Sequence, residues 1–232
     1  MTQCMGHVDE MTRLGLIPSP FVGAVSWRAV AAVLPNGVAI DYGGVSGPDW
    51  FEGAASRIAA QVDDRPWTAV LHSGAGPFAP ALADGSASLA GFIFVDAGLP
   101  TPGRSSLDGA GSEFVARLRA RTTDGVLAPW NSWFDVDPTE RMIPDAAARA
   151  AFIAAQPRVP FAFLEAPCPG SIAWESLPCA YLQLSRLYEA DALAAVQRGW
   201  LVERLRANHL AMCGDPARVA AAILKLTTRL GG

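Results

Sequence analysis

The stretch that decides the fold reads Thr68-Ala69-Val70-Leu71-His72-Ser73-Gly74-Ala75-Gly76-Pro77. An apolar run typical of a buried strand ends at Leu71, and a serine follows within two residues. Small residues come next, and the chain then continues with residues compatible with a helix. A strand, a very tight turn carrying Ser and a helix follow one another in this way in a nucleophile elbow. Such a turn exposes the hydroxyl to a base and aims the first N–H groups of the helix at a reacting carbonyl.

The elbow pattern G-x-S-x-G is met only in part. Ala75 is small, as its position requires, but Leu71 stands where a glycine normally lets strand and helix pack closely. Gly76 could relieve some of this crowding. The alternative is a glycine-rich strand-to-helix turn of any α/β protein, in which Ser73 has no chemical role.

The composition limits the class of protein. Of the 232 residues, 51% are hydrophobic, which is enough for a sizeable core in one domain. The net charge of −4 does not suggest a nucleic-acid partner. The longest apolar runs, such as Leu89–Val95, are too short to span a membrane. Met1–Glu10 lack the basic-then-apolar pattern of a signal peptide, so we expect a soluble cytoplasmic protein.

Cysteine and histidine spacing argues against a metal site. The four cysteines are Cys4, Cys168, Cys179 and Cys213. They show no C-x-x-C spacing, so we expect reduced thiols rather than disulfides or a zinc site, and no bound metal. Residues 1 to about 11 have the composition of a loose tail, and His7 within it has no second His or Cys pair nearby.

Strand and helix patterns alternate along most of the chain. Strands are expected at 14–17, 38–40, 67–71, 89–95, 159–164 (weakened by Pro160), 179–184 and 200–205, the last at a sheet edge. Helices are expected at 26–34 with Ser26 as N-cap, at 49–62, from Ser73 to near 84, at 187–197, and from Asp215 to Leu230. This alternation predicts an α/β fold, with a mostly parallel sheet and helices on both of its faces.

The alternation stops between residues 101 and 157. From about Glu113 the pattern indicates helices interrupted by turns, with Trp130, Trp133 and Phe134 close together. We predict a core formed by 1–100 and 158–232, and a helical cap formed by 101–157. Aromatic residues in a cap usually serve packing, but here they would roof a substrate pocket if Ser73 is active.

Four segments in this order resemble the α/β-hydrolase family, across nearly the whole chain. They are the loop Pro18–Trp27, the elbow His72–Gly76, the strand Phe92–Ala97 and the C-terminal stretch Asn208–Pro216. The last is similar to the histidine-bearing loop of small plant-type methyl esterases and hydroxynitrile lyases. Too few residues precede the first strand for the N-terminal hairpin of the family, so we expect a sheet of about six strands without that hairpin.

The resemblance implies Ser73 as nucleophile and His209 as its general base, with the acid between them in the sequence. His209 lies in a loop between a late strand and the final helix, where the family needs its histidine. His72 is expected to support the elbow rather than to act as the base. For a hydrolase, Ser73 Oγ and His209 Nε2 should lie near hydrogen-bond reach, about 2.6–3.2 Å.

The residue that would serve as the acid is less well defined. The usual place in the family falls at about Leu187, which cannot orient an imidazole, while Glu189 and Asp191 lie just beyond it. A family variant places the acid after the strand that follows the elbow helix, and here that residue is Asp96. Glu165 is a third option. We favour Asp96 because the carboxyl end of that strand lies beside the elbow, although a loop-capping role is the alternative.

The oxyanion-binding groups also depart from the family pattern. One donor would be the N–H of Gly74. The other would come from Pro20, which has no N–H, so Phe21 could donate only if the loop is shifted. Pro18 and Ser19 replace the His and Gly of the family. Losing one donor typically costs about 2.7–4 kcal/mol of transition-state stabilisation.

Three classes of function remain open. The first is a cofactor-independent serine hydrolase that acts on an ester, lactone or thioester of a small apolar metabolite. The second is a lyase, isomerase, epimerase or cyclase of a biosynthetic pathway, in which His209 or a carboxylate transfers a proton and Ser73 only hydrogen-bonds. The third is an inactive small-molecule binder. Acylation of Ser73 separates the first from the second. The expected partner is a small-molecule substrate, and the sequence leaves the oligomeric state open, a homodimer included.

Overall fold

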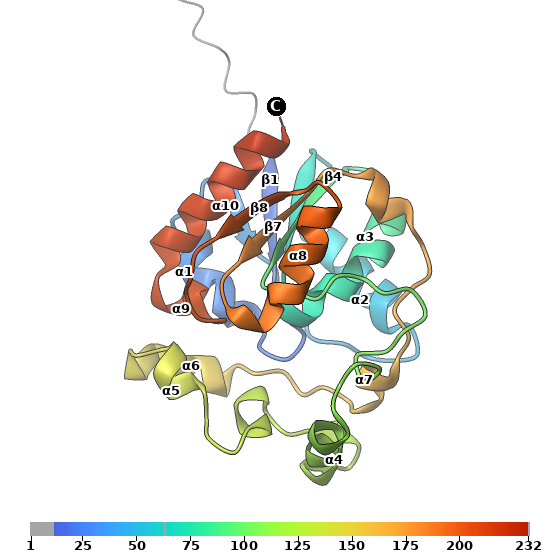
Figure 1. Ribbon diagram of the computed structural model, residues 1–232, viewed down its shortest axis with the longest axis vertical. Helices are drawn as coiled ribbons and strands as arrows, with labels where there is room; N and C mark the ends of the chain where they lie inside the picture. Colours follow the sequence, from blue (N-terminus) through green and yellow to red (C-terminus); the bar gives the residue numbers. More distant parts are fainter. Residues whose placement is uncertain (1–11, 63, 232) are drawn as a thin grey trace, which may run out of the picture.

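A sheet of six parallel strands runs in the order β2-β1-β3-β4-β7-β8 (Figure 1). Its strands are β1 (Arg13–Ile17), β2 (Gly37–Ala39), β3 (Trp67–His72), β4 (Leu89–Val95), β7 (Cys179–Gln183) and β8 (Leu201–Arg204). All neighbouring strands pair in parallel. The predicted α/β class and parallel six-stranded sheet are therefore confirmed, and β8 lies at an edge as expected.

The computed structural model describes residues 12–62 and 64–231. The tail expected at 1 to about 11, with Cys4 and His7, lies outside the described residues. In the described part of the chain, the sheet begins with β1, and no helix has the length and apolarity needed to cross a membrane. Cys168, Cys179 and Cys213 are free thiols.

Helices cover both faces of the sheet (Figure 1). One face carries α1 (Arg28–Ala31), α9 (Ala211–Gly214) and α10 (Pro216–Leu230), and the other carries α2 (Trp50–Ala59), α3 (Ala79–Gly85) and α8 (Glu189–Gln197). Successive side chains of a strand point to opposite faces. In β3, Val70 therefore packs into the first layer, whereas Ala69 and Leu71 pack into the second.

The final helix begins as predicted, and the first helix does not. The Asp215 side chain accepts a hydrogen bond from Arg218 N at 3.3 Å, and Pro216 is the first helical residue of α10. Near the N-terminus, the 3-10 turn η1 (Ala24–Trp27) precedes a short α1. Ser26 lies inside that turn and is not an N-cap, because its hydroxyl donates to Gly23 O at 2.8 Å instead.

The prediction of a strand at 159–164 is wrong. Pro160 forms only an isolated bridge with Val126, and α7 (Ala162–Glu165) follows directly. A proline cannot donate to a sheet ladder, so this apolar run does not join the sheet. Phe161, Phe163 and Leu164 are buried in the core all the same, which explains why the run looked like a strand.

The segment between β4 and β7 holds most of the elements that lie away from the sheet. It contains α4 (Ser112–Ala120), the two-stranded pair β5 (Thr122–Thr123) and β6 (Val126–Leu127), η3 (Trp130–Trp133), α5 (Thr139–Met142) and α6 (Ala146–Ala154). Figure 1 shows α4, α5 and α6 in green and yellow beyond one end of the sheet. The division into a core and a cap at 101–157 stays a prediction.

Candidate active site

Ser73 lies at a sharp turn between a strand and a helix. It directly follows β3 and begins the 3-10 turn η2 (Ser73–Phe78), which leads into α3. Its backbone φ is +56°, in the left-handed region that side chains other than glycine rarely adopt. Backbone strain of this kind concentrates at functional sites, where the surrounding structure holds it.

A glycine other than the one expected by the elbow pattern permits the tight turn. Leu71 stands at the glycine position of the pattern, and its side chain is fully buried in the core. The close backbone approach occurs at Gly76 instead, because a Cβ there would lie 1.8 Å from the carbonyl oxygen of Gly98. Gly98 belongs to the loop after β4, so Gly76 lets the elbow pack against the neighbouring loop.

Ser73, His209 and Asp96 form a continuous hydrogen-bonded chain. Ser73 Oγ lies 3.0 Å from His209 Nε2, and His209 Nδ1 lies 3.0 Å from Asp96 Oδ2. The first distance falls within the range expected for a hydrolase. Three side chains that are far apart in sequence, all of them buried, therefore meet at the carboxyl ends of β3, β4 and β8.

Asp96 is held as a carboxylate that accepts four hydrogen bonds. Oδ1 accepts from the backbone N–H groups of Leu184 (2.7 Å) and Ser185 (2.9 Å), and Oδ2 accepts from the Ser185 hydroxyl (2.6 Å) and from His209. Burial alone raises the pKa of Asp96, but the hydrogen bonds from His209 and Ser185 outweigh it and hold the pKa below the usual value. Asp96 is therefore ionised at neutral pH.

The other carboxylates considered for the acid lie elsewhere. Glu189 accepts from Gln183 at 2.8 Å and pairs with Arg204 at 3.5 Å. Glu165 pairs with Arg119 at 2.7 Å on the surface. Asp191 accepts from Leu99 N at 3.0 Å. Among the carboxylates that the sequence offered, Asp96 is the one hydrogen-bonded to His209.

His72 connects the elbow to the loop that carries His209. Its Nε2 lies 3.1 Å from the backbone oxygen of His209, and the two rings are 4.6 Å apart. Burial, with repulsion from His209, lowers the pKa of His72 to about 3. The ring is thus neutral, and its Nε2–H donates because a carbonyl oxygen only accepts. This contact agrees with the expected supporting role.

The sequence interpretation missed Tyr188, which contacts the candidate nucleophile. The phenol oxygen lies 3.1 Å from Ser73 Oγ, and the Tyr188 ring stacks on His209 with centroids 5.2 Å apart. Tyr188 ends the 3-10 turn η5 (Arg186–Tyr188), next to Leu187, where the usual family acid was sought. The signal in the sequence was that a titratable residue, Tyr188, directly follows Leu187.

The protonation states fix the direction of these hydrogen bonds. Because the carboxylate of Asp96 only accepts, His209 Nδ1 carries a proton, and in the neutral imidazole Nε2 is then an acceptor. Ser73 then donates its single proton to His209, so the hydrogen bond with Tyr188 must be donated by the phenol. Burial raises the pKa of Tyr188 to about 12, and the phenol therefore keeps its proton at neutral pH.

Gly74, Ser19 and Phe21 meet beside the elbow. Gly74 lies in the first turn of η2, where N–H groups have no intrahelical partner. A Cβ on Gly74 would lie 2.9 Å from the Phe21 ring and 3.2 Å from Ser19 Oγ. The N–H of Phe21, expected as a donor, points to Ser19 Oγ at 3.4 Å. The buried Ser19 hydroxyl thus stands next to Gly74.

No family model matches the chain, and no curated protein sequence matches it significantly. Solved structures do match over nearly their full lengths. Tomato methylketone synthase I, crystallised as a variant with β-ketoheptanoate, is similar at a TM-score of 0.74 and 14% identity, over 95% of this chain and 99% of that one. The chain has the α/β-hydrolase fold.

Two further structures with the α/β-hydrolase fold are similar. An extracellular α/β-hydrolase from a Paenibacillus species, described as sharing structural and functional homology with tobacco salicylic acid binding protein 2, has a TM-score of 0.73 at 16% identity, over 93% of this chain and 98% of that one. A pyrethroid hydrolase from Sphingobium faniae JZ-2 has a TM-score of 0.69 at 18% identity, over 94% of this chain and 98% of that one.

Of the aromatic residues predicted for the pocket, Trp130 lies beside the hydrogen-bonded chain, and Trp133 and Phe134 pack against other aromatic residues. The Trp130 ring lies 6.3 Å from that of His209. Trp133 packs edge-on against Phe21 at 4.8 Å, and Phe134 packs against Trp130 at 5.3 Å. The stretch around η3 therefore covers the carboxyl ends of the strands. A role of these residues in substrate binding stays a prediction.

Proposed function

We propose that the protein is a cofactor-independent serine hydrolase that cleaves an ester, lactone or thioester of a small apolar molecule. The observation that carries the proposal is the chain of hydrogen bonds from Asp96 through His209 to Ser73, with both links to the imidazole at 3.0 Å. In this arrangement the carboxylate fixes the tautomer of the imidazole and stabilises the imidazolium that forms during the reaction.

The first half of the reaction forms an acyl-enzyme. Ser73 Oγ attacks the substrate carbonyl carbon while its proton moves to His209 Nε2, and the carbonyl oxygen becomes an oxyanion. When the tetrahedral intermediate collapses, the bond to the leaving oxygen or sulfur breaks, and His209 gives its proton to that leaving group. The product of this half is an alcohol or a thiol, or, from a lactone, a hydroxyl on the bound acyl chain.

Two donors on one side of the elbow are available for the oxyanion. The N–H of Gly74 is one, as in the prediction from sequence. The Ser19 hydroxyl is the second that we propose, since it accepts from Phe21 and keeps its own proton for donation. This assignment offsets the loss of an N–H at Pro20.

The second half releases the acid. Water attacks the acyl carbon while His209 Nε2 takes one of its protons, and the new tetrahedral intermediate expels Ser73 Oγ. His209 returns the proton to that oxygen, which regenerates the resting enzyme. The N–H of Gly74 and the hydroxyl of Ser19 stabilise the oxyanion of this step as well.

The surroundings of Ser73 favour an apolar substrate of modest size. The rings of Trp130 and Tyr188 lie beside His209, and the Phe21 ring lies beside Gly74 and packs against Trp133. A site lined by aromatic rings with few polar groups selects apolar ligands and uses those polar groups to orient them. An ester with short or branched apolar groups is therefore the first substrate to try.

One observation favours a second candidate, an enzyme of the same fold that does not hydrolyse its substrate. Tyr188 donates to Ser73 Oγ, so a neutral acid and a base, Tyr188 and His209, stand on either side of the serine. Such a pair could transfer protons in a lyase or isomerase reaction, with Ser73 only hydrogen-bonding to the substrate. The likeness in fold to a methylketone synthase is compatible with such chemistry.

Labelling with a fluorophosphonate probe tests the hydrolase proposal. The wild-type protein should label rapidly at one site, and Ser73→Ala should not label. Ser176→Ala, which removes an exposed hydroxyl bonded to Ala173 O, is the matched control and should label like the wild type. A folded wild-type protein that stays unlabelled by both a large and a small probe would contradict the proposal and favour the non-hydrolytic enzyme. If the wild type labels and Ser73→Ala does not, panels of esters, lactones and thioesters would identify the substrate class.

A further inference from the structure

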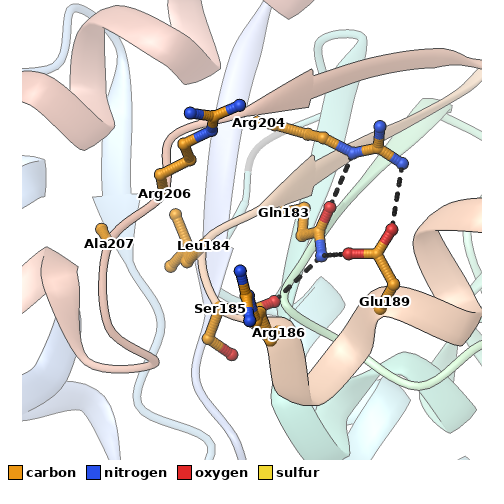
Figure 2. Close-up of a pocket in the computed structure, with 8 residues that line it drawn as sticks. All are labelled: Gln183, Leu184, Ser185, Arg186, Glu189, Arg204, Arg206 and Ala207. Carbon is orange, nitrogen blue, oxygen red and sulfur yellow. Dashed lines mark hydrogen bonds and ion pairs between the residues drawn. The ribbon is translucent and has the colours of Figure 1, made fainter.

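A cavity of about 620 Å³ is lined by residues at and just after the ends of β7 and β8. Figure 2 shows that Arg186, Arg204 and Arg206 extend around it. Three guanidinium groups thus line one cavity in a protein whose net charge is −4. These exposed guanidinium groups give the cavity a local positive charge, which favours an anion.

The positive charge of one of the three arginines, Arg204, is already paired with a carboxylate. Arg204 Nε donates to Gln183 Oε1 at 2.7 Å, and its guanidinium pairs with Glu189 at 3.5 Å. The Gln183 amide in turn donates to Glu189 at 2.8 Å, so these three side chains form a fixed wall (Figure 2). The single negative charge that lines the cavity is thereby matched, and the charges of the other two arginines are left over.

Arg186 and Arg206 carry these two surplus charges. Neither forms an ion pair or a side-chain hydrogen bond with another described residue. Arg206 also has a left-handed backbone, with φ of +49°, which is costly for a residue with a side chain. Two guanidinium groups that line one cavity repel each other, and a multiply charged anion between them would turn this repulsion into attraction.

The cavity borders the supports of the hydrogen-bonded chain. Ser185, one of its lining residues, donates its hydroxyl to Asp96 Oδ2 at 2.6 Å. Arg206 and Ala207 lead directly into the loop of His209. An anion held by Arg186 and Arg206 would therefore join the loop that fixes Asp96 to the loop that carries His209.

We propose that this cavity binds a polyvalent oxyanion of the phosphate type, clamped between Arg186 and Arg206 with Arg204 as a third donor. Guanidinium groups bind such oxyanions with paired, charge-assisted hydrogen bonds. Binding would tie the two loops together and steady the relative position of Asp96 and His209. The proposal concerns binding alone and holds whether or not Ser73 is a nucleophile.

Calorimetric titration with inorganic pyrophosphate tests it, at an ionic strength of about 20 mM so that screening is weak. The wild-type chain should bind one equivalent, and Arg186→Gln and Arg206→Gln should each bind about tenfold more weakly. Arg229→Gln, at the far end of α10, makes the same change of charge and should bind like the wild type. Phenyl phosphate in place of pyrophosphate distinguishes the source of the anion: its binding would indicate a phosphate carried on a larger ligand, and its failure a free anion.

Two outcomes would overturn the proposal. One is the absence of binding by the wild type at millimolar pyrophosphate. The other is an equal loss of pyrophosphate affinity in Arg229→Gln and the two cavity variants, because binding would then depend on the net charge of the protein and not on the cavity. Circular dichroism should show that each variant is folded. If Arg206→Gln does not fold, Arg186→Gln alone suffices for the test.

Discussion

The hydroxyl of Ser185 donates a hydrogen bond of 2.6 Å to Oδ2 of Asp96, the same oxygen that meets His209 Nδ1 at 3.0 Å. Ser185 also donates its backbone N–H to the other carboxylate oxygen at 2.9 Å. A single residue at the end of β7 thus holds both oxygens of the candidate acid at the end of β4. The Ser185 hydroxyl helps to keep the pKa of Asp96 low, against the effect of burial.

Replacing Ser185 with Ala should weaken this support in a pH-dependent way. A carboxylate with a lowered pKa stabilises the fold above its unfolded-state pKa, and this stabilisation is lost as the pH falls and the carboxylate is protonated. At pH 7 we expect the free energy of unfolding to fall by about 1–2 kcal/mol. Below about pH 4 the difference between variant and wild type should shrink.

Urea denaturation across this pH range measures the effect of Ser185→Ala. Ser176→Ala is the control, since its hydroxyl is exposed and donates only to Ala173 O. It should change stability by less than about 0.5 kcal/mol at every pH. A difference for Ser185→Ala that stays constant from pH 7 to pH 3 would contradict the role assigned to the hydroxyl.

Tyr188→Phe should slow the labelling of Ser73 about tenfold. The phenylalanine keeps the ring that stacks on His209, but it removes the hydroxyl 3.1 Å from Ser73 Oγ. In the proposed reaction, that hydroxyl would hold the Ser73 oxygen in position and stabilise the charge that grows on it as its proton leaves. Rates of labelling by the fluorophosphonate probe, with thermal melting as the check of folding, measure the change. An unchanged rate would exclude an active role for the phenol.

His72 should make the protein sensitive to acid. Burial, together with repulsion from His209, lowers its pKa to about 3, whereas an exposed histidine in the unfolded chain titrates near 6.5. The unfolded state therefore takes up this proton first, and stability falls as the pH drops from about 6.5 toward 3. The loss from this one group is at most about 1.4 kcal/mol per pH unit.

His72→Gln removes the titration and keeps an amide donor for the backbone oxygen of His209. The free energy of unfolding of this variant should fall less steeply than that of the wild type between pH 6 and pH 4, in matched urea titrations. Parallel curves for the two proteins would show that His72 does not remain neutral in the folded state.

Gly76→Ala should fail to fold or should lose about 3 kcal/mol or more of stability. The new Cβ would lie 1.8 Å from Gly98 O, and both sides of that contact are backbone, which cannot rotate away. Gly98→Ala is the matched control across the same contact. A Cβ on Gly98 has no heavy atom within 4 Å, so this variant should melt close to the wild type. Similar melting temperatures for the two variants would contradict this account of the elbow.

The parts of the fold that the sequence predicted best are those with strong local signals. Buried parallel strands such as β4 are continuous apolar runs, and the last helix carries its cap and its proline in adjacent positions. Asp96 follows from topology, because a residue that ends a strand beside the elbow strand must lie near the serine. The run at 159–164 misled because burial alone does not distinguish a strand from a buried turn.

The contacts that could not be predicted are long-range and depend on side-chain packing. Tyr188 meets Ser73 across 115 positions of the chain, and no local pattern encodes that distance. Glu189 lies in the region where the family acid was sought, but its place at the start of α8 turns it toward Gln183 and Arg204. The Ser19 hydroxyl reaches the elbow only because the loop after β1 folds over Gly74.

Because Asp96 directly follows β4, the candidate acid does not depend on the turn at 186–189. Ser73 and Asp96 leave the sheet from adjacent strands, where His72 and Val95 are paired, so the sheet itself sets their spacing. The turn at 186–189 does not have to supply the acid, although Tyr188 from this turn still faces the serine. Directed evolution can therefore vary the positions of this turn other than Tyr188, while the geometry between the candidate nucleophile and the candidate acid is set by the sheet.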